Sequence, residues 1–230
     1  MRRVSCLLMT LATLLLLTAC GQSVTAKLHT NQSGFNAVVT GKTQAKKIYW
    51  QVDDTIHSKT TTDGTFKIEV PYRTKAYRVT LADNQQLTNP TYLDGAKTTP
   101  MISWFNFIAK YNPLANQQGI GIFDTTPFDG IHTDQVDEQT AIAMNVNNSQ
   151  IIGISIKALS PSKNVTFNKY LTAFTTSLGT NPTTVAALVE KSLKAPNQLT
   201  QMTSQHIIYT VVTSTVQKQT LTQISMSYAK

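Results

Sequence analysis

The chain has 230 residues and carries 20 lysines and arginines against 12 aspartates and glutamates, a formal net charge of +8. This length allows one large or two small domains with their own cores, and the positive charge favours either an anionic partner or simple solubility. Both cysteines, Cys6 and Cys20, lie near the start of the chain. A disulfide framework, a cysteine-ligated metal site and a cysteine nucleophile are therefore excluded from the folded body.

Residues 1–19 have the pattern of an export signal. Met1-Arg2-Arg3 is followed by an uncharged run up to Leu17, and this run is shorter than the roughly 20 apolar residues of a membrane-spanning helix. The segment Leu17-Thr18-Ala19-Cys20 resembles the lipobox of bacterial lipoproteins. The resemblance implies cleavage before Cys20, a diacylglyceryl group on its sulfur, and attachment to the extracytoplasmic face of the cell membrane. An ordinary secretory peptide cut after Ala19 is the alternative.

Residues 20–33 are polar and weakly patterned, which predicts a tether between the lipid-anchored Cys20 and the folded body. Residues 34–95 then show a strand period. Apolar residues alternate in four segments, Phe35–Val39, Ile48–Val52, Thr65–Val70 and Tyr77–Leu81. Asp63-Gly64 predicts a two-residue hairpin turn between strands 58–62 and 65–70. Short strands separated by regular turns predict an antiparallel β-sandwich.

This region resembles a bacterial immunoglobulin-like domain. The resemblance covers roughly Val24 to Leu93 and rests on Val39-Thr40-Gly41-Lys42-Thr43, on the segment 62–71 and on the segment 77–81. It implies an immunoglobulin-like β-sandwich over residues 34–95, with a spacer or adhesion role. Because no cysteine is present there, the antibody-type disulfide is excluded. An independent small β-barrel is the competing interpretation.

The polar stretch from Asn84 to Thr99 predicts a domain boundary, followed by an α+β domain over residues 100–230. We recognise no family in this second domain. Its pattern predicts helices packed on one face of an antiparallel sheet. The expected elements are a helix over 101–111 ended by Asn112-Pro113, a hairpin of 141–146 and 151–157, helices over 167–178 and 182–193, and strands over 204–214 and 219–228.

Acidic side chains gather in a part of this domain that has no lysine or arginine, between Tyr111 and Ile156. Five carboxylates accompany His132 there: Asp124, Asp129, Asp134, Asp137 and Glu138. Calcium prefers such oxygen ligands, so these five are the candidate metal ligands. The spacing lacks the EF-hand pattern, and a solvated acidic loop is the favoured interpretation. We therefore expect neither a metal nor a cofactor.

Three further features have two interpretations each. Gly119-Ile120-Gly121 suggests either a phosphate loop or, better, a bend at the start of a strand over 120–123. The aromatic residues of the 101–111 helix suggest either an apolar groove or, at their helical spacing, a core. The lysines after Ile156 are scattered, which argues against a nucleic-acid partner.

The sequence thus predicts a membrane-anchored extracytoplasmic lipoprotein with a non-enzymatic binding, adhesion or scaffold role. Its partner would be an envelope protein, a peptide or a wall polymer. A small envelope hydrolase using the 124–138 loop and a solute-capturing lipoprotein are the alternatives. No G-x-S-x-G segment is present, and no serine motif is linked to a histidine; no catalytic residue is therefore expected.

Overall fold

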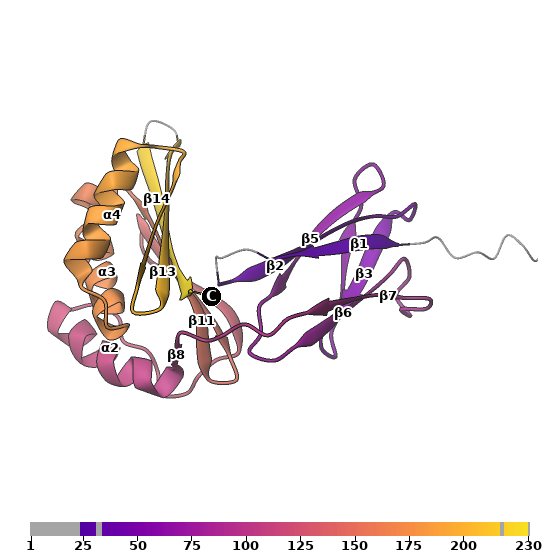
Figure 1. Ribbon diagram of the computed structural model, residues 1–230, viewed down its shortest axis with the longest axis horizontal. Coiled ribbons are helices and arrows are strands. Elements are labelled where there is room, and N and C mark those ends of the chain that lie inside the picture. Colours follow the sequence, from indigo (N-terminus) through magenta and orange to yellow (C-terminus); the bar gives the residue numbers. More distant parts are fainter. Residues whose placement is uncertain (1–23, 31–33, 217–218, 230) are drawn as a thin grey trace, which may run out of the picture. The chain divides into compact units, whose positions relative to one another are not determined.

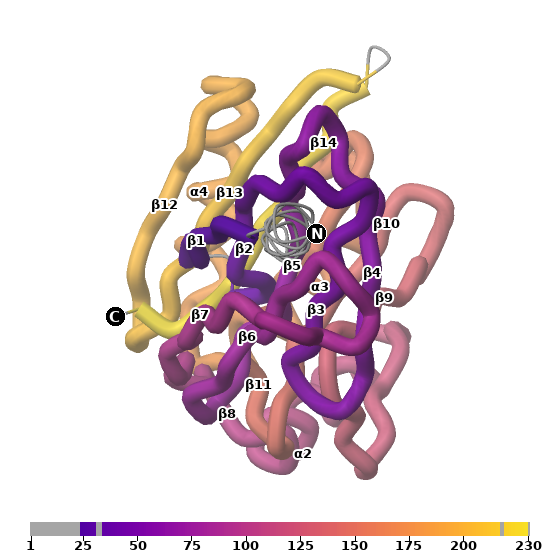
Figure 2. The backbone as a smooth tube through the Cα atoms, turned by 90° about the vertical axis from the view of Figure 1, so that its right-hand side faces the viewer, coloured from indigo at the N-terminus to yellow at the C-terminus, as the bar shows by residue number. Residues whose placement is uncertain are grey.

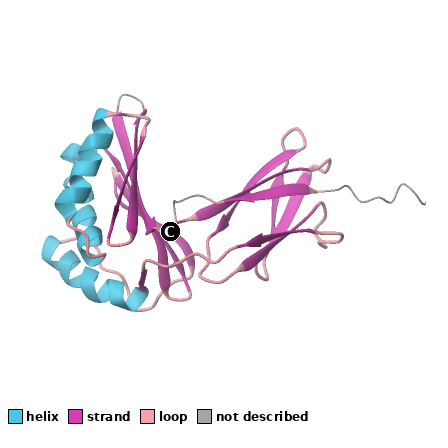
Figure 3. Ribbon diagram, in the orientation of Figure 1, coloured by secondary structure: helices cyan, strands magenta, loops and turns pink. Residues whose placement is uncertain are grey.

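The computed structural model describes residues 24–30, 34–216 and 219–229, and the predicted signal, the lipobox and Cys20 lie outside these ranges. Antiparallel strands dominate the described chain, together with three α-helices (Figures 1 and 3). The chain forms two compact units. Unit 1 comprises residues 1–29, 38–68 and 78–95, and unit 2 comprises residues 30–37, 69–77 and 96–230. None of the described helices combines the length and the apolar character needed to span a membrane.

The first seven strands form two sheets, with orders β1-β2-β5 and β4-β3-β6-β7. The pairs β1–β2, β3–β4 and β3–β6 are antiparallel. Side chains from both sheets are buried in unit 1, among them Val39, Ile48, Phe66 and Leu81. The strands are β1 (Thr25–His29), β2 (Asn36–Lys42), β3 (Lys47–Gln51), β4 (Ile56–Thr60), β5 (Thr65–Pro71), β6 (Tyr77–Ala82) and β7 (Thr91–Gly95).

The two-residue turn at Asp63-Gly64 lies where the sequence predicts it, but the predicted hairpin of strands 58–62 and 65–70 is not formed, because β4 and β5 belong to different sheets. Asp63 and Gly64 both have positive φ, 50° and 70°, and Thr62 and Thr65 form the bridge that closes the turn. This is the geometry that an Asp-Gly pair favours, because glycine adopts a left-handed backbone without a steric penalty.

Two strands of unit 1 lie where the sequence pattern predicts none. Residues 25–29, predicted as part of the tether, form β1, and residues 91–95, at the end of the predicted immunoglobulin-like domain but without a predicted strand, form β7. Both are edge strands of their sheets. Exposed and half-buried side chains alternate along each of them, and only Gly95 is buried. Because an edge strand is held by backbone hydrogen bonds on one side and buries little, its sequence shows no strong apolar alternation.

Unit 2 contains a seven-stranded sheet of order β12-β13-β14-β11-β10-β9, with β8 also paired to β11 (Figure 2). Its strands are β8 (Ile102–Ser103), β9 (Gly130–Asp137), β10 (Thr140–Asn147), β11 (Gln150–Leu159), β12 (Leu199–Ser204), β13 (Ile207–Val216) and β14 (Gln219–Tyr228). Its helices are α2 (Trp104–Gln118), the short 3₁₀ helix η1 (Pro161–Lys163), α3 (Val165–Ser177) and α4 (Pro182–Lys194).

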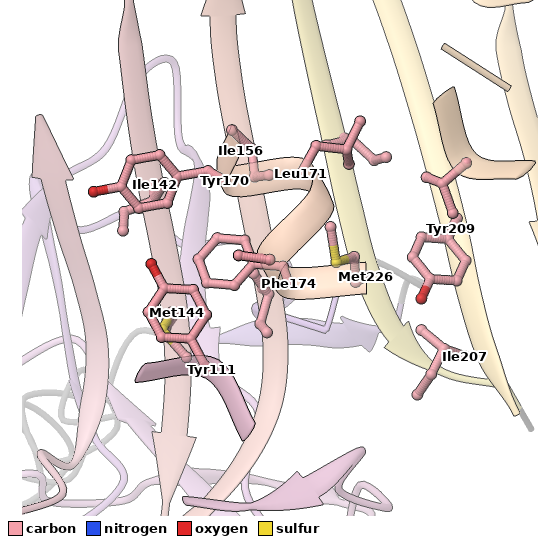
Figure 4. Close-up of a cluster of buried hydrophobic side chains, with 14 of the residues drawn as sticks. Tyr111, Ile142, Met144, Ile156, Tyr170, Leu171, Phe174, Ile207, Tyr209 and Met226 are labelled. Atoms are coloured by element: carbon pink, nitrogen blue, oxygen red, sulfur yellow. The ribbon is translucent and has the colours of Figure 1, made fainter. Parts of the chain in front are cut away.

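The α-helices cover one face of this sheet, as predicted (Figures 1 and 3). Phe174 of α3 and Tyr111 of α2 lie beside one another, with their rings stacked and the ring centroids 5.1 Å apart (Figure 4). Ile154 and Ile156 of β11 are fully buried in the same cluster. The aromatic residues Trp104, Phe107 and Tyr111 therefore belong to the core, while Phe105 is exposed.

Helix α2 begins and ends later than predicted, since Ile102–Ser103 form β8 and the helix begins at Trp104. It continues through Pro113 to Gln118 and ends at Gly119, which has a φ of 64°. Proline cannot donate to the carbonyl of residue i−4, so one helical bond is lost. The second half of the helix is nevertheless held by tertiary packing, because Tyr111 and Ala115 on either side of Pro113 are fully buried. Packing of this kind overrides local propensity.

The region after α2 also differs from the prediction. Residues 120–123 form a loop instead of a strand, and much of the predicted acidic loop, residues 130–137, forms β9. Strand β9 is an edge strand paired with β10, and most of its side chains are exposed or half-buried. Its polar composition is compatible with a strand because its backbone needs a partner on one side only.

Segments 34–37 and 69–77 belong to unit 2 and contact the sheet through backbone atoms. The buried amide nitrogen of Asn145 lies 3.1 Å from the carbonyl oxygens of both Gly34 and Phe35. A Cβ atom on Gly153 would lie 2.6 Å from the Gly34 oxygen. The close backbone approach explains why glycine occupies position 153 in an otherwise apolar strand.

The two asparagine caps of α3 and α4 give a matched stability test. Asn164 is buried, accepts from the amide of Phe167 at 2.8 Å and donates to the Thr140 hydroxyl at 2.9 Å, whereas Asn181 accepts from Thr183 at an exposed end. We expect Asn181→Ala to lower the unfolding free energy by about 1 kcal/mol, and Asn164→Ala to cost clearly more because it also removes the bond to buried Thr140. Equal losses in denaturant titrations would contradict this assignment.

Candidate functional site

A groove of about 690 Å³ lies within unit 1. It is lined by residues of β1, β2 and β5 and by the end of β4 with the turn that follows it. Four lysines, Lys27, Lys42, Lys59 and Lys67, stand at its wall, and none of its lining residues is acidic. The remaining lining residues are Thr25, Ala26, Thr40, Gly41, Thr60, Thr62, Thr65 and Phe66. We call this site the lysine groove.

Strand pairing brings these lysines together. Thr25 pairs with Lys42 and Lys27 with Thr40, so one lysine from each strand lies within two register positions of the other. Strand β5 lies beside β2 in the same sheet, and Lys67 alternates there with buried Phe66 and Ile68. Since successive side chains of a strand point to opposite faces, Lys67 points to the solvent side of the sheet.

The fourth lysine comes from the other sheet. Lys59 of β4 extends its ammonium group to the backbone carbonyl of Lys67 at 2.8 Å. All four lysine side chains are exposed, and no described carboxylate forms an ion pair with them. Glu69, the acidic residue nearest to Lys67 along β5, instead accepts a hydrogen bond from Asn36 at 3.0 Å.

A close backbone approach shapes the floor of the groove. Gly41 lies so near to the Phe66 ring and to the Thr25 carbonyl that a Cβ at this position would overlap both. Phe66 is buried. The absence of a side chain at position 41 therefore lets β1, β2 and β5 approach closely. The lysines of these strands are brought near one another as a result.

The lysine groove can bind anionic groups. Each ammonium group carries three hydrogen-bond donors and a full positive charge. Threonines also line the groove, although the hydroxyls of Thr65 and Thr40 already contact the Thr62 carbonyl and the His29 ring. Unpaired like charges that lie side by side create a positive potential, which an anionic ligand with several charges would neutralise. One hydroxyl of the lining, that of Thr40, contacts the ring of His29 at 2.9 Å, but no acidic residue lines the groove to orient that histidine. Four lysines without an acidic neighbour in the lining make binding the chemistry that the groove supports best.

The candidate metal ligands do not converge. In the part of the chain that the structure describes, no three histidine, aspartate or glutamate side chains form a cluster able to hold a metal ion. Three of the carboxylates accept from nearby amides: Asp124 from Thr125, Asp129 from Asn148 and Asp137 from Gln139. Asp134 contacts His132 at 2.9 Å, and Glu138 is exposed in the turn after β9.

The other three histidines also have structural neighbours. His29, expected in the tether, lies on β1 and contacts the Thr40 hydroxyl at 2.9 Å. The ring of His57 stacks on Trp50, and that of His206 stacks on Tyr228. In the described ranges none of the four histidines has a serine hydroxyl among its hydrogen-bond partners.

The loop after α2 is held by side chains in place of a neighbouring strand. Asn112 donates to the carbonyl of Phe123 at 2.9 Å and accepts from its amide at 3.1 Å. The Tyr111 hydroxyl donates to the carbonyl of Gly121, whose amide donates to the Tyr170 hydroxyl. These contacts satisfy the backbone of the segment for which a phosphate loop was the alternative interpretation, so Gly119-Ile120-Gly121 offers no free group of amides.

Comparison with known protein families, curated proteins and solved structures gives no match for this chain. The lysine groove is therefore interpreted from its own geometry and charge. The sequence pattern does not indicate this groove, because the four lysines are spread over β1, β2, β4 and β5 without a spacing motif. The one available signal was the excess of lysine in the N-terminal region.

Gly41 provides a test of how the groove is built. We expect Gly41→Ala to lower the unfolding free energy by about 1–3 kcal/mol, since the added methyl group overpacks against Phe66 and the Thr25 backbone. Thr40→Ala, at the neighbouring half-buried position, should change stability by less than about 1 kcal/mol. Denaturant titration measures both changes. An unchanged unfolding free energy in Gly41→Ala would show that the close approach does not constrain the sheet.

Three buried tyrosines should make the protein less stable at alkaline pH. Burial raises the pKa of Tyr111, Tyr170 and Tyr209 above the ordinary value of a phenol. The contribution of these tyrosines to the unfolding free energy is fully present below about pH 10, the pKa of tyrosine in the unfolded chain. It is lost as the pH rises above this value, because the tyrosines then ionise readily only in the unfolded chain. We expect the melting temperature to fall above about pH 10, and to fall less steeply in Tyr111→Phe. Identical slopes in the two proteins would contradict the role of Tyr111.

Proposed function

We propose that this protein is a lipid-anchored extracytoplasmic protein of the bacterial envelope that binds an anionic ligand through the lysine groove and catalyses no reaction. One observation carries the binding role. Four exposed lysines from four strands surround a space of about 690 Å³ into which no acidic side chain projects. The anchor rests on the lipobox resemblance of Leu17-Thr18-Ala19-Cys20 and on the diacylglyceryl group that it implies for Cys20.

We also propose that the first seven strands form an immunoglobulin-like β-sandwich. In the constant-type domain, strands one, two, five and four make one sheet and strands three, six and seven the other. Here the orders are β1-β2-β5 and β4-β3-β6-β7. The same partition is kept, except that the fourth strand pairs with the third. This agreement supports the assignment, and so does the two-residue turn at Asp63-Gly64.

The ligand is expected to carry several anionic oxygens on a surface or chain. Lysine binds phosphate and carboxylate as a mobile point charge, without the fixed two-pronged geometry of arginine. Four separate ammonium groups therefore suit repeated anionic groups better than one compact ion. Phosphate-bearing wall polymers and anionic lipid headgroups share this chemistry.

Inorganic polyphosphate provides a direct probe of the groove. We expect the full chain to bind it, and the fourfold variant Lys27→Gln, Lys42→Gln, Lys59→Gln, Lys67→Gln to bind about tenfold or more weakly. Binding should also weaken as salt is raised, because the polyanion releases condensed counterions. Isothermal titration calorimetry at two salt concentrations measures both effects.

The matched control removes four other exposed lysines, all in unit 2: Lys157, Lys163, Lys191 and Lys194. Their replacement by glutamine changes the net charge equally and leaves the groove intact. We expect this variant to bind polyphosphate nearly as well as the wild type. Equal losses in the two variants would reject the groove and leave only a general effect of net charge.

A further inference from the structure

The lysine groove lies at the end of unit 1 where the chain arrives from Cys20. Strand β1 begins at Thr25, and its first register pair joins Thr25 to Lys42 of the groove. The Thr91 hydroxyl at the start of β7 donates to the carbonyl of Val24 at 2.7 Å and holds the entering chain beside β7. The first described residue and the groove therefore share one end of the unit.

Chain length limits how far the groove can lie from Cys20. Thr25 is the fifth residue after Cys20 and Lys27 is the seventh. A fully extended chain spans at most about 3.3–3.6 Å per residue, so Lys27 lies within roughly 25 Å of Cys20 in any conformation of the tether. A lipid on Cys20 would thus hold the groove close to the membrane surface.

Further positive charge lies at this same end. Lys46 lies between β2 and β3, and Lys47, the first residue of β3, pairs with Thr60 of the groove lining. Two acidic residues, Asp63 and Asp83, lie in turns at this end, but neither lines the groove. Asp53 and Asp54 follow the opposite end of β3. Lysines therefore outnumber acids at the end of unit 1 that is nearest to Cys20.

We propose that the lysine groove binds the anionic headgroups of the membrane in which Cys20 is anchored. This inference rests on the proposed function, since it requires both the lipid on Cys20 and anion binding by the groove. Each lysine near an anionic leaflet strengthens association about fivefold, and the attraction falls off within a Debye length of about 8–10 Å. The short tether limits the groove to about 25 Å from Cys20, so the groove can approach the leaflet to within the distance at which this attraction acts.

A wall polymer would be contacted at a different place. Polymer chains extend away from the membrane, whereas the groove lies at the end of unit 1 from which the chain continues to Cys20. Headgroups, in contrast, are present at that end at high local concentration, because the lipid on Cys20 would already reside among them. Geometry thus favours the membrane surface over the polymer as the occupant of the groove.

Headgroup proximity can be measured with fluorescent labels at the two ends of unit 1. The label replaces either Gln44, exposed between β2 and β3, or Asp54, exposed beyond the other end of β3. The chain isolated from bacterial membranes is reconstituted into vesicles of zwitterionic lipid with or without phosphatidylglycerol, and a headgroup-located quencher reports proximity. The fourfold groove variant and the fourfold unit 2 control defined above carry the same labels.

We expect the Gln44→Cys label to be quenched in phosphatidylglycerol vesicles at least about fivefold more strongly than in zwitterionic vesicles, as a single lysine contact would already give. The Asp54→Cys label should be quenched weakly in both. The difference in Gln44→Cys quenching between the two kinds of vesicle should persist in the unit 2 control. It should disappear in the groove variant and at high salt. The lipid on Cys20 is the same in every variant, so a loss of the quenching difference reports the groove lysines alone.

Two outcomes would overturn the proposal in distinguishable ways. If polyphosphate binding depends on the groove but Gln44 quenching does not depend on phosphatidylglycerol, the groove binds a polymer and the membrane assignment fails while the proposed function stands. If neither polyphosphate binding nor quenching depends on the groove lysines, both the membrane assignment and the anion-binding function fail.

Discussion

The close approach of Gly41 to the Phe66 ring and the Thr25 backbone is the constraint on which the lysine groove depends. It fixes three strands that carry Lys27, Lys42 and Lys67 near one another. The apolar core below and the charged surface above are thus consequences of the same packing. Repulsion between the lysines is tolerated because their ammonium groups stay in water, where like charges a few ångströms apart interact weakly, while burial of Phe66 stabilises the sheet beneath them.

The sequence predicted the interior strands and the helices far better than the sheet edges. The interior strands β2, β3, β6, β10, β11, β13 and β14, and helices α3 and α4, lie close to their predicted positions. Two edge strands, β4 and β5, were also predicted, and β5 buries alternate side chains as an interior strand does. Five strands were not predicted: β1, β7, β9 and β12, which are edge strands, and the two-residue β8, which pairs with β11 beside the main path of the sheet. Interior strands bury one or both faces and show apolar alternation, whereas an edge strand can be polar because its backbone alone holds it. Helix α2 was predicted too short because Pro113 was given more weight than its buried neighbours.

The candidate site could not be predicted for a related reason. A catalytic or metal motif is local in sequence, but the lysine groove is created by register, which places Thr25 opposite Lys42 and β5 beside β2. The acidic residues of the 124–138 region are close in sequence but do not form a site. Strand β9 and the turns around it spread them along a sheet edge, where each accepts hydrogen bonds from its own neighbours. Local density of charge therefore predicted the wrong cluster, and strand pairing assembled another.

The pairing of β1 with β2 also has a mechanical meaning. Five register pairs, from Thr25↔Lys42 to His29↔Val38, join the strand nearest to Cys20 to the rest of its sheet. The chain enters β1 beside the start of β7 and leaves β7 at Gly95, the far end of that strand. A force that pulls the two ends apart along the strand direction acts on these hydrogen bonds in shear. All of them must then break together, so the first strand resists extraction far better than a strand peeled away one bond at a time.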